Sequence, residues 1–352
     1  MKKILSAVLA AMLTVSLAAC GSKTPTTPTT TGTTGPSAAP TEKTIEFTLS
    51  TPDPDTSSVT VAANEFAKKV LEKSNGSIKI KVYPNGSLYG ADPSAAVKQL
   101  GSGALDMLVL STSLYANFEK KFNAISIPYL FDDTKQFTSY LNSATGKELL
   151  GSISTMGITG LGYWTRSFRQ ITNAVRPITV PADLAGVKLR VPNNPLWVNF
   201  FKEAGAIPTP MAFGEVYNAL QLKTIDGQEN PVDVPVSAKF YEVQKYISVT
   251  NHMADGWIVG INTKKYGELS DAQKKVLEEV TMEMQGWKVD YDSKQDQTAI
   301  DTLVSKGMTL NKITAEQQQQ FVDVSKKLYP TFKELVGDEA FFNKTLEFVG
   351  KK

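Results

Sequence analysis

The sequence predicts an α/β protein with two lobes, preceded by an export segment and a linker. Short apolar stretches with period-two alternation are separated by helical patterns between residues 45 and 110, and this alternation returns after residue 166. A long helical pattern then follows residue 270. A chain of 352 residues can bury a core in each of two domains. We therefore expect two α/β lobes, with one long helix running behind both.

The first residues have the pattern of a secretory signal peptide. Lys2 and Lys3 precede an apolar run over 4–19 that is short for a membrane span and ends in small residues. The run LAACG over 17–21 resembles the lipobox of bacterial lipoproteins, and Cys20 is the single cysteine of the chain. We expect 1–19 to be cleaved and Cys20 to be lipidated, which would hold the protein at a membrane surface. An ordinary signal peptide with a chance cysteine is the alternative.

Residues 20–43 form the next predicted segment, a lipidated cysteine followed by a disordered tether. It is almost entirely Gly, Ser, Thr, Pro and Ala, and offers no large apolar side chain to a core. Cleavage after residue 19 removes Lys2 and Lys3 from the 37 basic residues, so 35 basic side chains would face 35 acidic ones. This balance argues against a nucleic-acid partner.

The first lobe is expected to span 44–165, with returning C-terminal segments from about 255–352. Its predicted elements are a strand over 45–50, a helix across 61–71, a strand over 78–82, a helix over 92–103 and a strand over 105–110. Asn75 and Gly76 end the first helix, and Pro84, Asn85 and Gly86 close the second strand. Strands that alternate with helices predict a parallel sheet.

The second lobe is expected over 166–254. Its predicted elements are a strand over 187–191, a helix over 195–204 and a helix over 214–222. Ser270 and Gln273 then fit a capping box, and only Gly286 interrupts the helical pattern before Gly307. Such a helix would be about 54 Å long at about 1.5 Å per residue.

The residues of common catalytic and metal sites are scarce. His252 is the single histidine, and we interpret it as structural. Asp53 and Asp55 begin like a calcium loop, but the serines that follow break its pattern. Two acidic pairs, Asp226 with Glu229 and Asp132 with Asp133, fit a turn or a helix terminus better than a catalytic dyad. We therefore predict no enzyme activity, metal or cofactor.

Five runs of the chain resemble one known family. They read RQITN over 169–173, PADLAGVKLRVPN over 181–193, PTPMAFGEVYNALQ over 208–221, DGQENP over 226–231 and KFYEVQK over 239–245. They are similar to the substrate-binding proteins of tripartite ATP-independent periplasmic (TRAP) transporters, especially the sialic-acid-binding members. The resemblance starts near Ile45. It implies a periplasmic-binding-protein-like clamshell that delivers a small organic acid to a large and a small integral membrane subunit.

The resemblance also implies the carboxylate-binding residues. Arg190 matches an arginine that pairs with the ligand carboxylate, a role that suits the planar fork of guanidinium donors. Asn230 matches an asparagine on the same carboxylate, with an Asx turn before Pro231 as its alternative role. Arg169 matches a second arginine on the ligand side, although the segment from it to Arg190 is one residue longer here. Phe213 matches an aromatic residue that packs on the ligand, and a core position is its alternative.

The far end of the ligand is less defined. Ser50 and Ser111 stand where the sialic-acid binders carry an asparagine and a glutamate, which makes sialic acid doubtful. The expected residues at this end are Ser50, Thr51, Asp53, Ser111, Thr112, Trp164 and Trp257. Aromatic rings beside hydroxyls favour a sugar acid such as a uronate, with a C4-dicarboxylate or another carboxylate as alternatives. A binding protein of an ATP-driven importer, a ligand sensor and a surface hydrolase are the rival functions.

Overall fold

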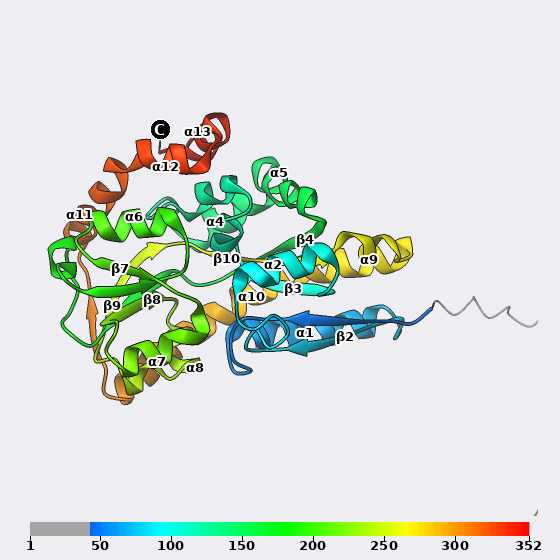
Figure 1. The fold of residues 1–352 in the computed structure, drawn as a ribbon, viewed down its shortest axis with the longest axis horizontal. Coiled ribbons are helices and arrows are strands. Elements are labelled where there is room, and N and C mark those ends of the chain that lie inside the picture. The colour runs from blue at the N-terminus through cyan, green and yellow to red at the C-terminus, as the bar shows by residue number, and fades with distance from the viewer. Residues whose placement is uncertain (1–42, 352) are drawn as a thin grey trace, which may run out of the picture. The chain divides into compact units, whose positions relative to one another are not determined.

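The computed structural model describes residues 43–351. The expected signal peptide, Cys20 and all but the last residue of the expected tether lie outside this range. The described chain contains two β-sheets with helices packed around them (Figure 1). We call the part built on the first sheet the first lobe and the part built on the second sheet the second lobe.

The first sheet has five strands in the order β2-β1-β3-β10-β4. Their bounds are β1 (Ile45–Ser50), β2 (Ile78–Tyr83), β3 (Met107–Ser111), β4 (Ile158–Thr165) and β10 (Gly256–Asn262). β1 pairs in parallel with β2 and β3, whereas β10 runs antiparallel to both β3 and β4. The three strands predicted for this sheet are parallel as expected, and the sheet is mixed because a strand from late in the chain, β10, inserts between β3 and β4.

The first helices begin and end where the sequence predicts. α1 (Ser58–Lys73) starts after Ser57, whose side chain accepts a hydrogen bond from the Thr60 amide. α2 (Pro93–Ser102) is capped by Asp92 and ends at Gly103, which has a left-handed φ of 85°. Phe66 on α1 packs in the core of the first sheet. These caps satisfy helix-terminal amides and fix where the loops before each helix lie.

The second sheet has six strands in the order β11-β9-β5-β8-β6-β7. Their bounds are β5 (Arg169–Asn173), β6 (Lys188–Val191), β7 (Ile207–Pro210), β8 (Gly227–Asn230), β9 (Tyr246–Met253) and β11 (Thr309–Lys312). β6 is parallel to β7 and β8, and β5 is antiparallel to β8 and β9. β11 pairs with β9. This strand of the C-terminal segment therefore joins the second sheet, whereas we expected the whole segment to return to the first lobe.

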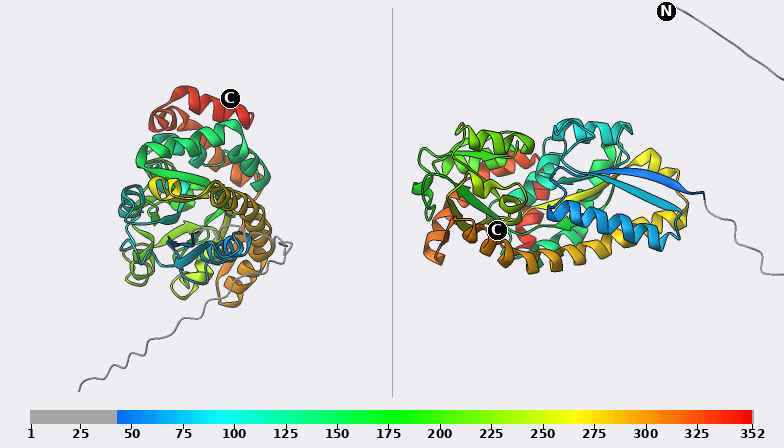
Figure 2. Two further views of the ribbon diagram at one scale, coloured as in Figure 1. Left: turned by 90° about the vertical axis from the view of Figure 1, so that its right-hand side faces the viewer. Right: turned by 90° about the horizontal axis from the view of Figure 1, so that it is seen from below.

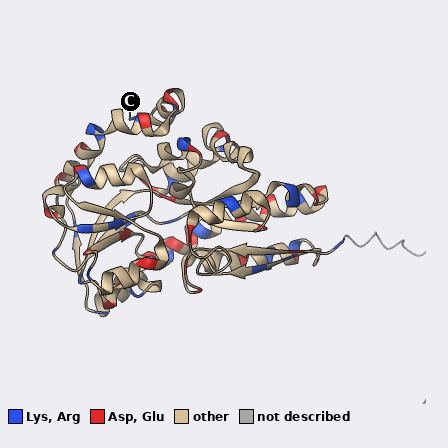
Figure 3. Ribbon diagram, in the orientation of Figure 1, with Lys and Arg blue, Asp and Glu red and all other residues tan. Residues whose placement is uncertain are grey.

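The remaining helices surround the two sheets. Their bounds are α3 (Thr112–Tyr115), α4 (Thr134–Asn142), α5 (Ala144–Ser152), α6 (Pro195–Glu203), α7 (Val216–Gln221), α8 (Asp233–Ser237), α9 (Thr263–Gly267), α11 (Ala315–Lys327), α12 (Tyr329–Val336) and α13 (Glu339–Phe348). In Figure 1, α11 to α13 run over α6 toward α4 and α5 at the top of the view. Basic and acidic residues are mixed over these elements (Figure 3).

The long helix is α10 (Asp271–Ser305), which has 35 residues and is therefore about 52 Å long. Ser270 and Gln273 form the expected capping box. The helix contacts α1 and β4 in the first lobe and α8 and β11 in the second lobe, and Figure 2 shows it along one side of the described chain. Between residues 43 and 351, no helix is both long and apolar enough to cross a membrane.

Besides α10, two short segments connect the lobes. Residues 166–168 lead from β4 to β5, and Ala254 with Asp255 leads from β9 to β10. Because each segment joins a strand of one sheet to a strand of the other, a rotation of the lobes would have to be absorbed here and in α10.

Candidate ligand-binding site

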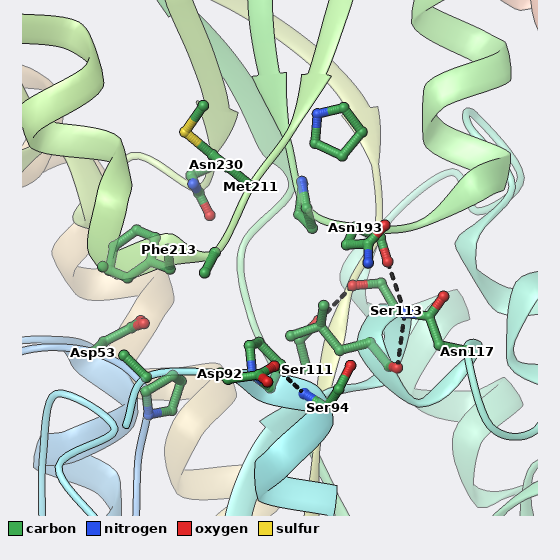
Figure 4. Close-up of a pocket in the computed structure, with 18 of the residues that line it drawn as sticks. Asp53, Asp92, Ser94, Ser111, Ser113, Asn117, Asn193, Met211, Phe213 and Asn230 are labelled. Carbon is green, nitrogen blue, oxygen red and sulfur yellow. Dashed lines mark hydrogen bonds between the residues drawn. The ribbon is translucent and has the colours of Figure 1, made fainter. Parts of the chain in front are cut away.

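A cavity of about 260 Å³ lies between the two lobes. It opens at the carboxyl ends of β1, β3, β6, β7 and β8, since its walls include residues that end or directly follow each of these strands. Figure 4 shows the residues that line it. In open α/β sheets, ligands bind outside the carboxyl ends of the strands. The location and size of this cavity fit a small ligand.

Arg190 is the residue before the last of β6, lies in the buried part of the strand and lines the cavity. Its side chain is 3% exposed, and its Nε and Nη2 donate to the Met211 carbonyl at 3.2 and 2.8 Å. No carboxylate of residues 43–351 lies within 4.0 Å of it. Burial lowers the pKa of its guanidinium to about 10, with partial compensation from Glu229, so the group stays charged at neutral pH. A buried cation without an ionic partner is an anion-binding group.

Arg169 on β5 also lines the cavity, but its charge is already compensated. Its Nη2 donates to Glu229 Oε1 at 2.8 Å, and its Nη1 donates to Asp255 Oδ2 at 3.2 Å. Burial lowers the pKa of Arg169, and the attraction of Glu229 more than reverses this effect. Arg169 therefore first forms structural ion pairs within the second lobe and with the segment between β9 and β10, and any contact with a ligand is additional to them.

His252 completes the group around Glu229, 3.2 Å from its carboxylate. Burial lowers the pKa of the imidazole, so the ring is neutral and Nε2–H donates to Glu229. Nδ1 then accepts from the Thr250 hydroxyl at 2.8 Å. The histidine is thus fully hydrogen-bonded and outside the cavity lining, in agreement with its expected structural role.

Arg166 is a third arginine of the cavity that sequence reasoning missed. Its guanidinium lies 4.3 Å from the centre of the Trp257 ring and donates to Asp255 at 3.4 Å and to Asn230 Oδ1 at 3.4 Å. Its Nε has no hydrogen-bond partner in the described chain. No motif of the sequence marks Arg166. It directly follows β4, a strand that we did not predict from the sequence.

Asn230 and Phe213 both line the cavity. Asn230 is the last residue of β8 and lines the cavity, and its amide donates to Gln228 Oε1 at 2.7 Å. Phe213 begins a short 3-10 helix over Phe213–Glu215, with its ring 6.0 Å from the Arg190 guanidinium carbon. Figure 4 shows both residues on the second-lobe side of the cavity.

Asp53 is a buried carboxylate in the cavity wall formed by the first lobe, opposite the wall that carries Arg190. It follows β1, is 6% exposed and lines the cavity. Burial raises the pKa of this carboxyl to about 6, partly offset by the charge of Arg166. Its carboxylate has no ion pair within 4.0 Å in the described residues. The cavity thus holds two buried charges without ionic partners in the described chain, Arg190 from the second lobe and Asp53 from the first.

Of the other expected ligand residues, Ser111 and Trp257 line the cavity and four do not. Ser50 donates to the Tyr83 carbonyl at 3.2 Å, and Thr51 bonds Thr60 at 2.8 Å. Thr112 donates to Asp255 at 3.0 Å. Trp164 is buried between Phe66 and α10. These four side chains are directed into the lobe or the hinge, a distinction that strand position alone does not reveal.

The rim of the cavity joins the two lobes through polar residues that sequence reasoning also missed. Asn117, after α3, donates to the Asn193 carbonyl at 2.7 Å, as Figure 4 shows. Asn194, before α6, donates to the Ser113 carbonyl at 2.9 Å. Tyr89, between β2 and α2, is 4% exposed and its hydroxyl has no partner in the described chain. These rim contacts keep the two walls together around the cavity.

A second and larger cavity, of about 730 Å³, lies beside α11 and the hinge residue Phe168. Its nearby Lys351 is already paired with Asp132 at 2.5 Å. No arginine lines it, and its other lysine, Lys326, is exposed to solvent, so its size does not make it the better site for an anion. Within residues 43–351, no group of acidic, histidine or cysteine side chains is arranged to hold a metal ion.

Comparison with known proteins shows the family to which the chain belongs. The family model of bacterial extracellular solute-binding protein, family 7, matches residues 49–335. The 2,3-diketo-L-gulonate-binding periplasmic protein of Escherichia coli is 34% identical over 76% of this chain and 80% of its own. The C4-dicarboxylate-binding periplasmic protein of Vibrio cholerae is 33% identical over 79% and 82%. The sugar acid binding protein of Advenella mimigardefordensis, solved with galactonate, superimposes with a TM-score of 0.84 at 29% identity, covering 88% and 99%.

The chain is therefore an extracytoplasmic solute-binding protein. It belongs to the family 7 bacterial extracellular solute-binding proteins, the substrate-binding components of TRAP transporters. Members of this family bind small carboxylates and work with TRAP membrane subunits, and they are not enzymes. The hydrolase and the ATP-driven importer are thereby set aside as alternatives.

Proposed function

We propose that the protein captures a sugar acid in the cavity between its lobes, with Arg190 as the carboxylate-binding residue, and delivers it to the TRAP membrane subunits. The observation that carries this proposal is the burial of Arg190 in the cavity wall without an ionic partner. A ligand carboxylate supplies the missing charge, and its two oxygens match the guanidinium fork. Removal of water on closure strengthens this interaction.

The other residues of the second-lobe wall support the same end of the ligand. Asn230 and Arg169 lie beside Arg190 in the cavity lining, and Phe213 covers the guanidinium. Asn230 already bonds Gln228, so its second amide hydrogen is the one available to the ligand. Arg169 contributes mainly positive potential, since Glu229 and Asp255 already accept from it.

The ligand class follows from the polar character of the opposite wall. The indole Nε1 of Trp257 and the hydroxyl of Tyr89 are buried without partners in the described chain, and both residues line the cavity. Buried donors of this kind are satisfied by ligand oxygens. A sugar acid, such as a uronate or an aldonate, provides several oxygens in a small volume. The relatives named for diketogulonate and solved with galactonate favour this class, whereas the C4-dicarboxylate relative favours the alternative.

Membrane attachment through Cys20 is a further part of the proposal. Cys20 lies outside the described residues, so the support is the LAACG run after an apolar signal segment. Metabolic labelling of the full chain with a palmitate analogue, compared with Cys20→Ser, tests it. Loss of label in the variant is the expected result, and label that persists in the variant would contradict lipidation at this residue.

The experiment for the binding function is a thermal-shift screen over uronates, aldonates, C4-dicarboxylates and keto acids, followed by calorimetry on the strongest ligand. Arg190→Lys keeps the charge but loses the fork, so we expect affinity to fall about 10- to 100-fold, the value of a charge-assisted hydrogen bond of about 1.5–3 kcal/mol. Arg176→Lys, the same change at an exposed arginine outside the cavity, should leave affinity unchanged. Equal affinity in both variants would remove Arg190 from the assigned role.

A further inference from the structure

Asp53 is held in place by its backbone while its side chain is left unpaired. Its carbonyl accepts from the Asn85 amide at 2.9 Å and from the Thr60 hydroxyl at 3.3 Å, which fixes the loop between β1 and α1. Its carboxylate has no hydrogen-bond or ionic partner in residues 43–351, although the residue is buried. Figure 4 shows this carboxylate directed toward the interior of the cavity. Such a buried acceptor needs a donor from outside the chain.

Tyr89 is a second unpaired group on the same wall. Its hydroxyl is buried without a partner in the described chain, and the residue lines the same cavity. Burial raises the pKa of this phenol, and the charge of Asp53 raises it further. The two residues lie on adjoining loops, because the Asn85 amide donates to the Asp53 carbonyl at 2.9 Å and the Tyr89 amide donates to the Gly86 carbonyl at 3.0 Å. A phenol donates and accepts, whereas a carboxylate only accepts. The two groups together match a ligand hydroxyl, which donates to one and accepts from the other.

We propose that Asp53 and Tyr89 recognise a hydroxyl at the end of the ligand remote from Arg190, and that Asp53 excludes ligands with a second carboxylate at that end. The inference rests on the proposed binding of a carboxylate at Arg190 and specifies which acids the site accepts. A second carboxylate would be buried against the carboxylate of Asp53, and like charges brought together in a desolvated site repel strongly. A terminal hydroxyl meets no such repulsion.

A ligand ammonium is a poorer match for Asp53 than a hydroxyl. Arg166 is the strongest charged influence on Asp53, and its guanidinium lies over Trp257 in the same cavity. It would repel a ligand cation placed beside Asp53. The other charges acting on Asp53 are those of Arg169 and Arg190, which are positive, and that of Asp233, which is negative. Asp92 also lines the cavity, where its carboxylate caps α2 by accepting from the Ser94 amide at 2.8 Å.

The proposed exclusion should depend on pH. Burial raises the pKa of Asp53 to about 6, so the carboxyl is ionised at about pH 7.5 and mostly protonated at about pH 5. Protonation removes the charge that repels a second carboxylate and turns an acceptor into a donor. Ligands with two carboxylates should therefore gain affinity relative to ligands with one as the pH falls through about 6.

The test compares acids that differ only at the far end. Galactonate and galacturonate carry a hydroxyl or a hemiacetal where galactarate carries a second carboxylate. We expect the wild-type protein to bind the better of the two monocarboxylates at least about tenfold more tightly than galactarate by calorimetry at about pH 7.5. This ratio should fall at about pH 5.

Asp53→Asn keeps the shape of the side chain and removes its charge. We expect this variant to bind galactarate more tightly and the monocarboxylate more weakly, so that the ratio of the two affinities falls by about tenfold. The ratio should also no longer depend on pH. Tyr89→Phe should lower the affinity for the monocarboxylate several-fold without raising the affinity for galactarate. Asp55→Asn, at an exposed position of the same loop, should leave the ratio at the wild-type value.

The outcomes separate this inference from the proposed function. An Asp53→Asn protein with the wild-type ratio would overturn the assignment of Asp53, and the proposed function would stand if Arg190→Lys still weakened binding. The assignment of Asp53 would also be overturned if an amino acid with an ammonium at the far end bound more tightly than the monocarboxylates. If no carboxylate bound wild-type protein whose fold circular dichroism had verified, both proposals would be wrong.

Discussion

Trp164 and Trp257 pair with each other across β4 and β10, yet their side chains serve different surroundings. Trp164 is fully buried, contacts Phe66 with ring centroids 5.7 Å apart, and donates to the Thr281 carbonyl at 3.2 Å. Trp257 lines the cavity beneath Arg166, and its indole nitrogen has no partner in the described chain. Both rings belong to the core of the first sheet, and Trp257 is also part of the cavity wall.

We therefore expect the same substitution to lower mainly the stability at Trp164 and mainly the ligand affinity at Trp257. Trp164→Phe should lower the free energy of unfolding by about 2 kcal/mol, since a hydrogen bond and core volume are lost, and should leave ligand affinity unchanged. Trp257→Phe should weaken ligand binding about fivefold, roughly 1 kcal/mol, with the smaller effect on stability. Urea denaturation and calorimetry on both variants measure the two quantities. The reverse pattern would show that the roles of the two rings are exchanged.

The sequence predicted the residues of the cavity wall around Arg190 better than those of the opposite wall. Arg190, Asn230 and Phe213 lie at or near strand ends within runs that resemble known proteins, and all three line the cavity. Ser50 also ends a strand, but its hydroxyl bonds the Tyr83 carbonyl within the sheet. Arg166 was missed because the hinge carries no periodic pattern. Which way a polar side chain points at a strand end depends on neighbours that are distant in sequence.

At the level of elements, helix α10 carries a glycine that the fold does not require. An added Cβ at Gly286 would meet nothing within 4 Å, and the residue lies on the exposed face in the helix interior. Gly286→Ala should therefore raise the free energy of unfolding by about 1 kcal/mol and the melting temperature by about 2 °C. Differential scanning calorimetry measures both.

Gly101, in the last turn of α2, is the matched contrast. A Cβ at this position would lie 2.2 Å from the Met156 carbonyl oxygen. Gly101→Ala should lower stability by about 1–3 kcal/mol, because a backbone group must move. A gain of stability in Gly101→Ala, or a loss in Gly286→Ala, would contradict the packing described for these two helices.

The predictable elements were those with local signals. Period-two alternation marked β1, and the capping box of Ser270 marked the start of α10. Strand direction and sheet membership were not local. β10 lies between β3 and β4, and β11 beside β9, because the chain crosses between the lobes after residue 253 and along α10. No pattern within these short strands encodes which neighbour each one pairs with.

At the scale of the whole molecule, a buried polar group links the two lobes beside α10. The Ser58 hydroxyl at the start of α1 donates to Asp233 at the start of α8 at 2.7 Å. Lys288 of α10 donates to Ser58 at 3.2 Å and is also paired with Asp292. The Ser58 to Asp233 contact can form only when the lobes are together, so it favours the arrangement in which the cavity is enclosed.

Removing this contact should therefore weaken ligand binding from a distance. We expect Ser58→Ala to reduce affinity about fivefold, the effect of one hydrogen bond of about 1 kcal/mol in the enclosed arrangement. Ser237→Ala removes a hydroxyl that bonds Val234 within α8 and should not change affinity. Calorimetry with the same ligand compares the two. Equal affinities would show that the contact does not contribute to closure.

The most direct measurement of the central claim is a crystal structure of the protein with its tightest ligand from the screen. The account predicts a ligand carboxylate within hydrogen-bond distance of the Arg190 guanidinium, and a ligand hydroxyl between Asp53 and Tyr89. A neutral ligand, or a carboxylate bound away from Arg190, would contradict it.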